Sequence, residues 1–164
     1  MRLDRDAMNL KIATETVALT ELAEKGLGPE RGENRPVVLV VDDERIVADT
    51  IADILQRSGF CATAEYRADT ALQFAAVIPP DLVIIDILLP GMNGIDLAVI
   101  MEKEYPDCRV LLLTADPATE EMVDKVRREG HNFPVLMKPL YPGDLLFAIA
   151  DPETASRAKQ HCNS

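Results

Sequence analysis

Leu82-Val83-Ile84-Ile85-Asp86 decides the fold class of this chain, because four apolar residues in succession end in one carboxylate. A run of this length is too short to span a membrane and too apolar for a half-exposed antiparallel strand. It is typical of a central strand in a parallel sheet that is covered on both faces. The ligand crevice of such a sheet lies outside the carboxyl ends of its strands, so Asp86 is predicted to lie at a binding site.

Three other apolar runs also end in polar residues. They are residues 37–41 before Asp42 and Asp43, residues 110–113 before Thr114, and residues 135–137 before Lys138. A shorter strand is predicted at 60–64, and helices are predicted at 44–58, 68–77, 95–104, 117–129 and 142–150. The first of these helices is predicted to bury one apolar face made of Ile46, Val47, Ile51, Ile54 and Leu55. The alternation of strand and helix predicts a doubly wound α/β fold, a parallel sheet with right-handed crossovers and helices on both faces.

The composition is that of a globular chain with an acidic surface. Hydrophobic residues make up 48% of the 164 residues, which is enough to bury a substantial core. The formal net charge is −11, of which residues 36–164 carry −10. A domain this acidic is a poor direct partner for nucleic acid or anionic lipid. Cys61, Cys108 and Cys162 have no C-x-x-C spacing, which fits a reducing compartment.

The chain is predicted to have three parts. Residues 1–35 are an N-terminal helical extension with a helix at about 6–25 and a glycine-rich linker. Residues 36–150 form the α/β domain, and residues 151–164 form a tail or a short helix at 152–161. Fourteen residues after Ala150 are too few for an output domain, so a stand-alone module is expected. Neither a secretory signal nor an apolar run of roughly 20 residues is present, so a cytoplasmic location without membrane insertion is expected.

Three carboxylates, a hydroxyl and an ammonium are therefore expected to meet at one edge of the sheet. Asp42, Asp43 and Asp86 would repel one another without a cation, and oxygen-only ligands favour Mg²⁺, with Mn²⁺ as the alternative. Lys138 separates a phosphoryl site from a simple cation site, since a mobile ammonium can neutralise a phosphoryl oxygen. Thr114 offers a hydroxyl to a further oxygen. Asp86 could then attack phosphorus and become an aspartyl phosphate.

Each of these residues alone is weak evidence, because a strand-terminal Asp is often a helix cap and a strand-terminal Thr is usually a turn residue. Together and in this order, they make residues 36–150 resemble a receiver domain of the two-component response-regulator family. The residues that carry the resemblance are Asp42-Asp43, Asp86, the loop 89–94 (Leu-Pro-Gly-Met-Asn-Gly), Thr114-Ala115 and Lys138-Pro139. The resemblance implies a flavodoxin-like five-stranded sheet. It also implies signalling without substrate turnover, so no enzyme activity is expected beyond the chain's own phosphorylation and dephosphorylation.

The resemblance also assigns a role to each site residue. Asp86 would accept a phosphoryl group from the phosphohistidine of a histidine kinase or phosphotransfer protein. Mg²⁺ would be held by Asp43, Asp86 and the backbone carbonyl of Leu88, with Asp42 helping through water. Thr114 and Lys138 would bind the phosphoryl group, and the peptide bond between Lys138 and Pro139 would be cis. The phosphorylated form would bind an unidentified downstream protein or self-associate as a homodimer.

Two positions raise questions of their own. Receivers usually have an aromatic residue three positions before the lysine, where this chain has Val135, so an atypical or weakened aromatic switch is predicted. Phe133 would share the face of Val135 on a regular strand, although Pro134 makes that regularity doubtful. Asp116 could orient or repel the water that hydrolyses an aspartyl phosphate. Its alternative role is to cap the following helix.

Two other interpretations stay open. The first is a metal-dependent phosphohydrolase, which would need a second acid soon after the nucleophile, whereas Ile87 and Leu88 follow Asp86. The second is a pseudo-receiver, an interaction domain that keeps these residues without using the chemistry. His131 and His161 lie on no convincing helix face opposite an acid, so neither is predicted to be catalytic.

Overall fold

Five parallel strands form the centre of the computed structural model, which describes residues 35–150. The strands are β1 (Val37–Val41), β2 (Cys61–Glu65), β3 (Leu82–Asp86), β4 (Arg109–Thr114) and β5 (Val135–Met137). Their order in the sheet is β2-β1-β3-β4-β5. The register pairs Val41 with Ile85 and Asp86 with Leu113, so the carboxyl ends of the three central strands lie level with one another. This is the predicted doubly wound, flavodoxin-like sheet.

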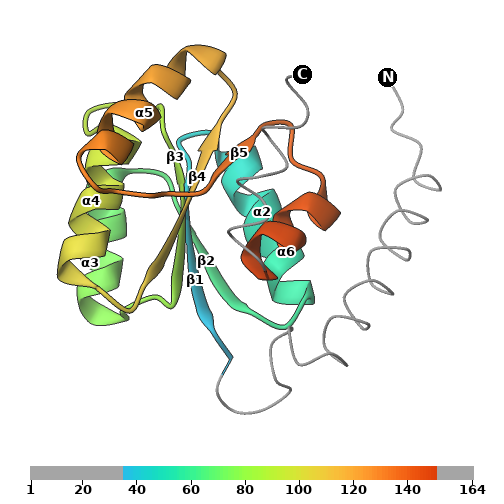
Figure 1. Ribbon diagram of the computed structural model, residues 1–164. Coiled ribbons are helices and arrows are strands. Elements are labelled where there is room, and N and C mark those ends of the chain that lie inside the picture. The colour runs from blue at the N-terminus through green and yellow to red at the C-terminus, as the bar shows by residue number, and fades with distance from the viewer. Residues whose placement is uncertain (1–34, 151–164) are drawn as a thin grey trace.

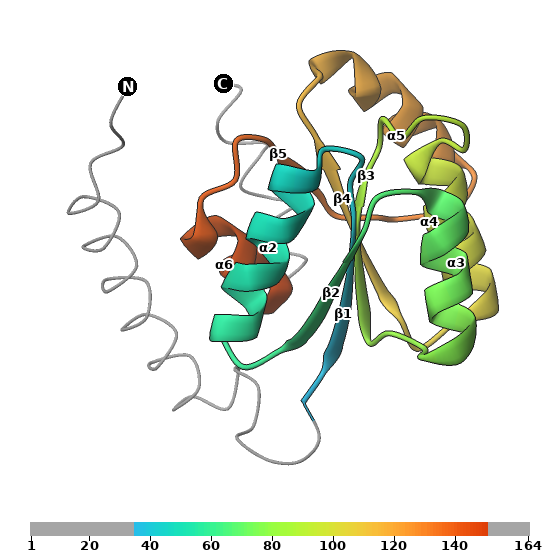
Figure 2. The ribbon, with the colours of Figure 1, turned by 180° about the vertical axis from the view of Figure 1, so that it is seen from behind.

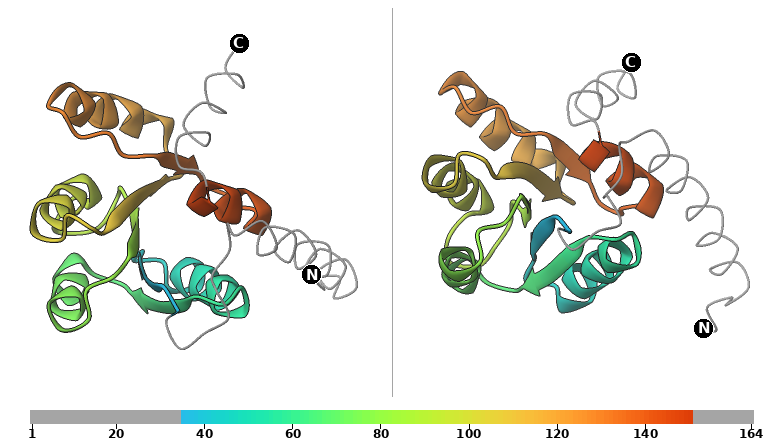
Figure 3. Two further views of the ribbon diagram at one scale, coloured as in Figure 1. Left: turned by 60° about the horizontal axis from the view of Figure 1, so that its bottom comes forward. Right: turned by 90° about the horizontal axis from the view of Figure 1, so that it is seen from below.

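Helices cover both faces of the sheet (Figures 1 and 2). They are α2 (Arg45–Arg57), α3 (Ala68–Val77), α4 (Gly94–Glu104), α5 (Glu120–Arg128) and α6 (Pro142–Ala150), with a 3₁₀ turn, η1 (Pro117–Thr119), before α5. The end-on views show α2 and α6 on one face and α3, α4 and α5 on the other (Figure 3). Within the described residues, no helix is long and apolar enough to cross a bilayer.

Two hydrophobic cores result, one under each helical layer. Successive residues of a strand point to opposite faces, so Val38 and Ile84 pack under α2 and α6, while Leu39 and Ile85 pack under α3, α4 and α5. All five residues of β3 are buried, which explains why its sequence shows no polar alternation. The strand most informative in the sequence is thus the one at the centre of the sheet.

The predicted apolar face of α2 was wrong at one residue. Ile51 and Leu55 are buried as predicted, but Ile46 is 83% exposed. The geometry of the helix explains this, because each residue turns by about 100° and Ile46 therefore lies roughly 140° away from Ile51. Ile46 instead lies at the opening between α2 and the segment that leads into α6.

The other predicted boundaries agree with the structure to within a few residues. The largest difference concerns the helix predicted at 117–129, which begins as the separate turn η1 and continues as α5. Asp116 directly precedes this turn, and its carboxylate Oδ1 accepts a hydrogen bond of 2.9 Å from the N–H of Ala118. The predicted helices at 6–25 and 152–161 lie outside the described residues.

Candidate functional site

The topology brings the predicted site residues to one edge of the sheet. From β1 the chain crosses to β2 on one side, and β3 then pairs with β1 on the other side. A change of winding direction of this kind opens a crevice at the carboxyl ends of the strands. Asp42 follows β1 and Asp86 ends β3 at this crevice, and both are almost fully buried, at 0% and 6% exposure.

Lys138 joins these two carboxylates. Its Nζ lies 2.6 Å from Asp42 Oδ2 and 3.0 Å from Asp86 Oδ2, and its side chain is only 11% exposed. The peptide bond that follows it, to Pro139, is cis, as the resemblance implied. The ammonium therefore lies between two carboxylates that come from sequence positions far apart. Among the described residues, every buried side-chain nitrogen or oxygen has a hydrogen-bond partner.

Burial and pairing act in opposite directions on the charges of this cluster. Burial raises the pKa of Asp42, and the hydrogen bond from Lys138 offsets only part of that effect. Burial alone would lower the pKa of Lys138, but its hydrogen bonds to Asp42 and Asp86 outweigh burial and raise it. The site thus holds its ammonium firmly charged while negative charge is in excess.

The acidic residues also form a group suited to a divalent cation. One carboxylate oxygen from each of Asp42, Asp43 and Asp86 lies within 4.8 Å of the others. Asp43 is exposed, so this group opens to solvent on one side. Oxygen-only donors of this number fit Mg²⁺, which keeps several of its waters when bound. The residues present therefore fit the metal that the sequence predicted.

The carboxylate of Asp86 has a fixed orientation. Its Oδ1 accepts a hydrogen bond of 3.1 Å from the N–H of Leu88, while its Oδ2 contacts Lys138. Behind it, Gly94 begins α4 so close to the strand that a Cβ atom there would lie 2.0 Å from the carbonyl oxygen of Asp86. Only glycine fits at this position, since the atom in the way is backbone. Asn93 caps the same helix by accepting a 2.8 Å bond from the N–H of Ile95.

Thr114 reaches the site at the end of β4, but its hydroxyl is directed into the next loop. Its Oγ1 lies 2.7 Å from Thr119 Oγ1 and 3.1 Å from both the carbonyl oxygen and the backbone nitrogen of Asp116. Both threonine side chains are buried. The structure thus places Thr114 where the sequence predicted it, with its hydroxyl bound to a partner that the sequence analysis missed.

The structure shows where Val135, its neighbour Phe133, and Asp116 lie. Phe133 and Val135 are both buried in the core under α3, α4 and α5, although β5 begins only at Val135. The ring of Phe133 stacks on His131, with centroids 5.9 Å apart, and His131 Nδ1 lies 2.7 Å from Glu102 Oε2. Asp116 has the predicted capping role. A weakened aromatic switch at Val135 stays a prediction.

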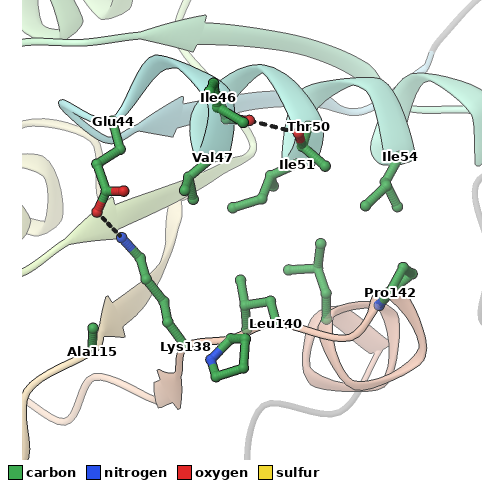
Figure 4. Close-up of a pocket in the computed structure, with 12 residues that line it drawn as sticks. Glu44, Ile46, Val47, Thr50, Ile51, Ile54, Ala115, Lys138, Leu140 and Pro142 are labelled. Carbon is green, nitrogen blue, oxygen red and sulfur yellow. Dashed lines mark hydrogen bonds and ion pairs between the residues drawn. The ribbon is translucent and has the colours of Figure 1, made fainter. Parts of the chain in front are cut away.

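An apolar groove adjoins the site. It has a volume of about 450 Å³ and lies between α2 and the segment from Lys138 to Leu145. Figure 4 shows Val47 and Ile54 of α2 on one side of it and Leu140 and Pro142 on the other. Lys138 lies at one end, 3.9 Å from a carboxylate oxygen of Glu44. The groove therefore leads to the same ammonium that contacts Asp86.

Comparison with known proteins gives the class of the chain. A family model described as the response regulator receiver domain matches residues 38–150. The DNA-binding response regulator MtrA of Mycolicibacterium paratuberculosis is 31% identical over 115 residues, which are 70% of this chain and 50% of that protein. The nitrogen assimilation regulatory protein NtrX of Azorhizobium caulinodans is 31% identical over 116 residues, 70% of this chain and 25% of that protein. The chain thus spans half the length of these two relatives or less.

Solved structures agree with this class. The signal receiver domain of an HD domain-containing protein from Pseudomonas fluorescens has a TM-score of 0.66 at 29% identity, covering 79% of this chain and 99% of that one. A CheY-like receiver domain protein from Methanospirillum hungatei has a TM-score of 0.64 at 26% identity, covering 78% of this chain and 99% of that one. The chain belongs to the response-regulator receiver family.

Sequence reasoning missed two residues that shape the site, Thr119 and Gly94. Thr119 gives no periodic signal, because its contact with Thr114 depends on the shape of a loop five residues long. Gly94 entered the sequence analysis only as the last residue of the loop 89–94, with no role of its own. The signal that could have found it is its position directly after the capping residue Asn93, where a helix begins against the back of a buried strand.

Proposed function

We propose that this receiver accepts a phosphoryl group on Asp86 from the phosphohistidine of a histidine kinase or a phosphotransfer protein. The phosphorylated form would then signal by binding a separate partner protein. One observation carries the proposal, namely that the Lys138 ammonium contacts Asp86 and Asp42 together at the switch point of the sheet. A structural ion pair would need one carboxylate, whereas a phosphoryl site needs a nucleophile and a cation that can follow the incoming oxygen.

The proposed transfer forms one bond and breaks one. An oxygen of Asp86 attacks phosphorus, and the phosphorus–nitrogen bond of the phosphohistidine breaks. Its electron pair stays on the imidazole nitrogen, which a proton from solvent can then neutralise. Leu88 and Lys138 hold the Asp86 carboxylate in place from both oxygens, which favours attack from a fixed position. Lys138 can move from Asp86 to an oxygen of the transferred group, because its charge is compact and its stem flexible.

A divalent cation completes the proposed site. Asp42, Asp43, Asp86 and the Leu88 carbonyl are the groups that would hold Mg²⁺ or, alternatively, Mn²⁺, directly or through water. When bound, the metal supplies positive charge that offsets the charge developing on the phosphoryl oxygens. Asp42 pairs with Lys138 on its buried side, so Asp43 is the more accessible ligand.

The groove beside the site is where we propose that the phosphodonor docks. The phosphohistidine must come within bonding distance of Asp86, and the groove ends at Lys138. Ile46 offers an apolar contact there, because it is 83% exposed. An Ile46→Arg variant should lose phosphotransfer from a cognate phosphohistidine protein about tenfold or more, a loss typical of an interface anchor. Its phosphorylation by acetyl phosphate should be unchanged, and an equal loss with both donors would place Ile46 outside the docking surface.

The pseudo-receiver is the second candidate, favoured by Val135 at the position usual for an aromatic residue. Intact mass after incubation with acetyl phosphate discriminates the two, run with Mg²⁺ and with a chelator. One Mg²⁺-dependent phosphoryl adduct is the result we expect. A folded protein that binds Mg²⁺ and forms no adduct would leave a phosphorylation-independent interaction domain. Turnover of a phosphate ester would instead revive the phosphohydrolase interpretation.

A further inference from the structure

The hydroxyl of Thr114 is held by a small hydrogen-bonded group in the loop after β4. Three oxygen atoms make up this group, which are Thr114 Oγ1, Thr119 Oγ1 and the carbonyl oxygen of Asp116. They lie 2.7 Å (Thr114 to Thr119), 2.7 Å (Thr119 to Asp116) and 3.1 Å (Thr114 to Asp116) apart. In addition, the N–H of Asp116 donates to Thr114 Oγ1 over 3.1 Å.

Counting protons shows that this group uses the only proton Thr114 has. The two hydroxyls supply two protons, and the carbonyl supplies none. The two shortest contacts form a chain in which Thr114 donates to Thr119 and Thr119 donates to the Asp116 carbonyl. Hydrogen bonds in such a chain strengthen one another, and burial strengthens them further. The proton that would bind a phosphoryl oxygen is therefore engaged elsewhere.

We propose that Thr119 is a positioning residue that holds Thr114 away from the phosphoryl site and so sets how readily Thr114 reaches a group bound to Asp86. This inference rests on the proposed function. Thr119 is suited to the role because it is only 2% exposed and η1 fixes its backbone. Its own N–H donates to the Asp116 carbonyl over 3.1 Å, and the Asp116 carboxylate caps the start of the turn.

The same geometry makes the release of Thr114 reversible. When Thr114 turns toward a phosphoryl oxygen, Thr119 keeps its 2.7 Å bond to the Asp116 carbonyl. Neither the buried hydroxyl of Thr119 nor that carbonyl is then left without a partner, which would be costly. What Thr114 gives up is one short buried contact and the N–H of Asp116. The N–H of Asp116 can then be hydrated, because Asp116 is exposed. The loop therefore offers two arrangements without an unpaired buried hydroxyl, and Thr119 favours the one in the structure.

The test compares Thr119→Val, which removes the hydroxyl at nearly constant shape, with Thr119→Ser, which keeps it. The readouts are the apparent affinity for beryllium fluoride with Mg²⁺, a stable mimic of the phosphoryl group, and the initial rate of phosphorylation by acetyl phosphate. We expect Thr119→Val to raise both by about threefold to tenfold, the effect of one neutral hydrogen bond, and Thr119→Ser to match the wild type. In a Thr114→Val background, Thr119→Val should have no effect, because the group it acts through is gone.

Several results would overturn the proposal. An unchanged or weaker response in Thr119→Val would do so, as would an equal increase in the Thr114→Val background, since a general effect on folding would not depend on Thr114. A further measurement does not depend on phosphorylation, namely the χ1 rotamer of Thr114 from NMR couplings in the untreated protein. We expect one rotamer in the wild type and in Thr119→Ser, and averaging in Thr119→Val. A wild type that takes no phosphoryl group would contradict the proposed function alone, while a fixed rotamer in Thr119→Val would contradict the role of Thr119 alone.

Discussion

The two edges of this sheet use charge in opposite ways. At the amino edge, Asp81 accepts the N–H of Val37 at 2.7 Å, and Arg109 donates to the carbonyl of Ile149 at 2.7 Å. Each of these two side chains satisfies a backbone group of a neighbouring element. At the carboxyl edge, the carboxylates of Asp42, Asp43 and Asp86 lie close together, and the Lys138 ammonium contacts two of them, Asp42 and Asp86. The first arrangement links neighbouring elements of the fold. The second leaves excess negative charge that can bind a cation, and an ammonium that can bind an anion.

A charged residue at the end of a strand therefore does not by itself identify a functional site in this fold, because Asp81 and Arg109 are exposed whereas Asp42 and Asp86 are buried. The identity of the partners does, because Lys138 joins two buried carboxylates from different strands, whereas Asp81 and Arg109 each pair with a backbone group. Substitutions at the carboxyl edge should therefore change phosphorylation, whereas substitutions at the amino edge should leave phosphorylation unchanged.

Asp86→Asn is expected to have the largest effect on chemistry. It removes the proposed nucleophile while keeping a similar shape, so phosphorylation by acetyl phosphate should fall at least a hundredfold, to background. The matched control is Asp81→Asn at the amino edge, which should leave phosphorylation unchanged. Intact mass spectrometry measures both. Normal phosphorylation of Asp86→Asn would remove the distinction between the two edges.

Lys138→Met should be the most destabilising change at the carboxyl edge. It leaves Asp42 and Asp86 buried without their cation, and breaking such a pair costs about 3–5 kcal/mol in the free energy of unfolding. The pKa of Lys138 is raised, so its contribution is fully present below its unfolded pKa of about 10.4 and is lost as the pH rises through the higher folded value. Denaturant unfolding should therefore show wild type and variant converging at strongly alkaline pH. A constant difference across that range would contradict the pairing.

Mg²⁺ should stabilise the carboxyl edge by a smaller amount. At ten times its dissociation constant, a ligand specific to the folded state adds about 1.4 kcal/mol to the free energy of unfolding. Thermal unfolding should shift upward with Mg²⁺ in the wild type, and less in Asp43→Asn, which removes the exposed carboxylate of the group. The control is Asp96→Asn, an exposed acid on α4 outside the cluster. An equal shift in all three proteins would mean that Mg²⁺ acts on general surface charge.

Arg109→Met tests the amino edge and should have the smallest effect. It removes the hydrogen bond to the Ile149 carbonyl at the end of α6, which is worth about 1 kcal/mol for a residue this exposed. Phosphorylation by acetyl phosphate should stay at the wild-type rate. A loss of phosphorylation without a loss of stability would show that the two edges are coupled through α6.

The central strands and their terminal residues could be predicted from the sequence for a physical reason. A strand buried on both faces must be apolar throughout, so Leu82 to Ile85 excludes most alternatives, and the polar residue that follows marks the edge of the sheet. Asp86 and Lys138 were found in this way, and the short distance between them follows from the parallel register. The family resemblance added the roles of these residues.

The rest depended on three-dimensional detail that periodicity does not contain. Ile46 is the exception, because the turn of about 100° per residue already places it roughly 140° from Ile51, and the apolar residues of α2 were grouped without these angles. Thr119 lies in a turn whose shape depends on the Asp116 cap and on Pro117. Its 2.7 Å contact with Thr114 arises only once that turn forms. The contact between Thr119 and Thr114 could not be predicted, because it depends on the geometry of a loop and not on the sheet.

A chemical method can locate the phosphoryl group on one residue. After incubation with acetyl phosphate and Mg²⁺, borohydride reduces an acyl phosphate on Asp to homoserine, and peptide mass mapping then identifies the position. We expect homoserine at position 86 and at no other acid of the cluster. Homoserine at Asp42 or Asp43, or none at all in a protein that carries the phosphoryl mass, would contradict this expectation.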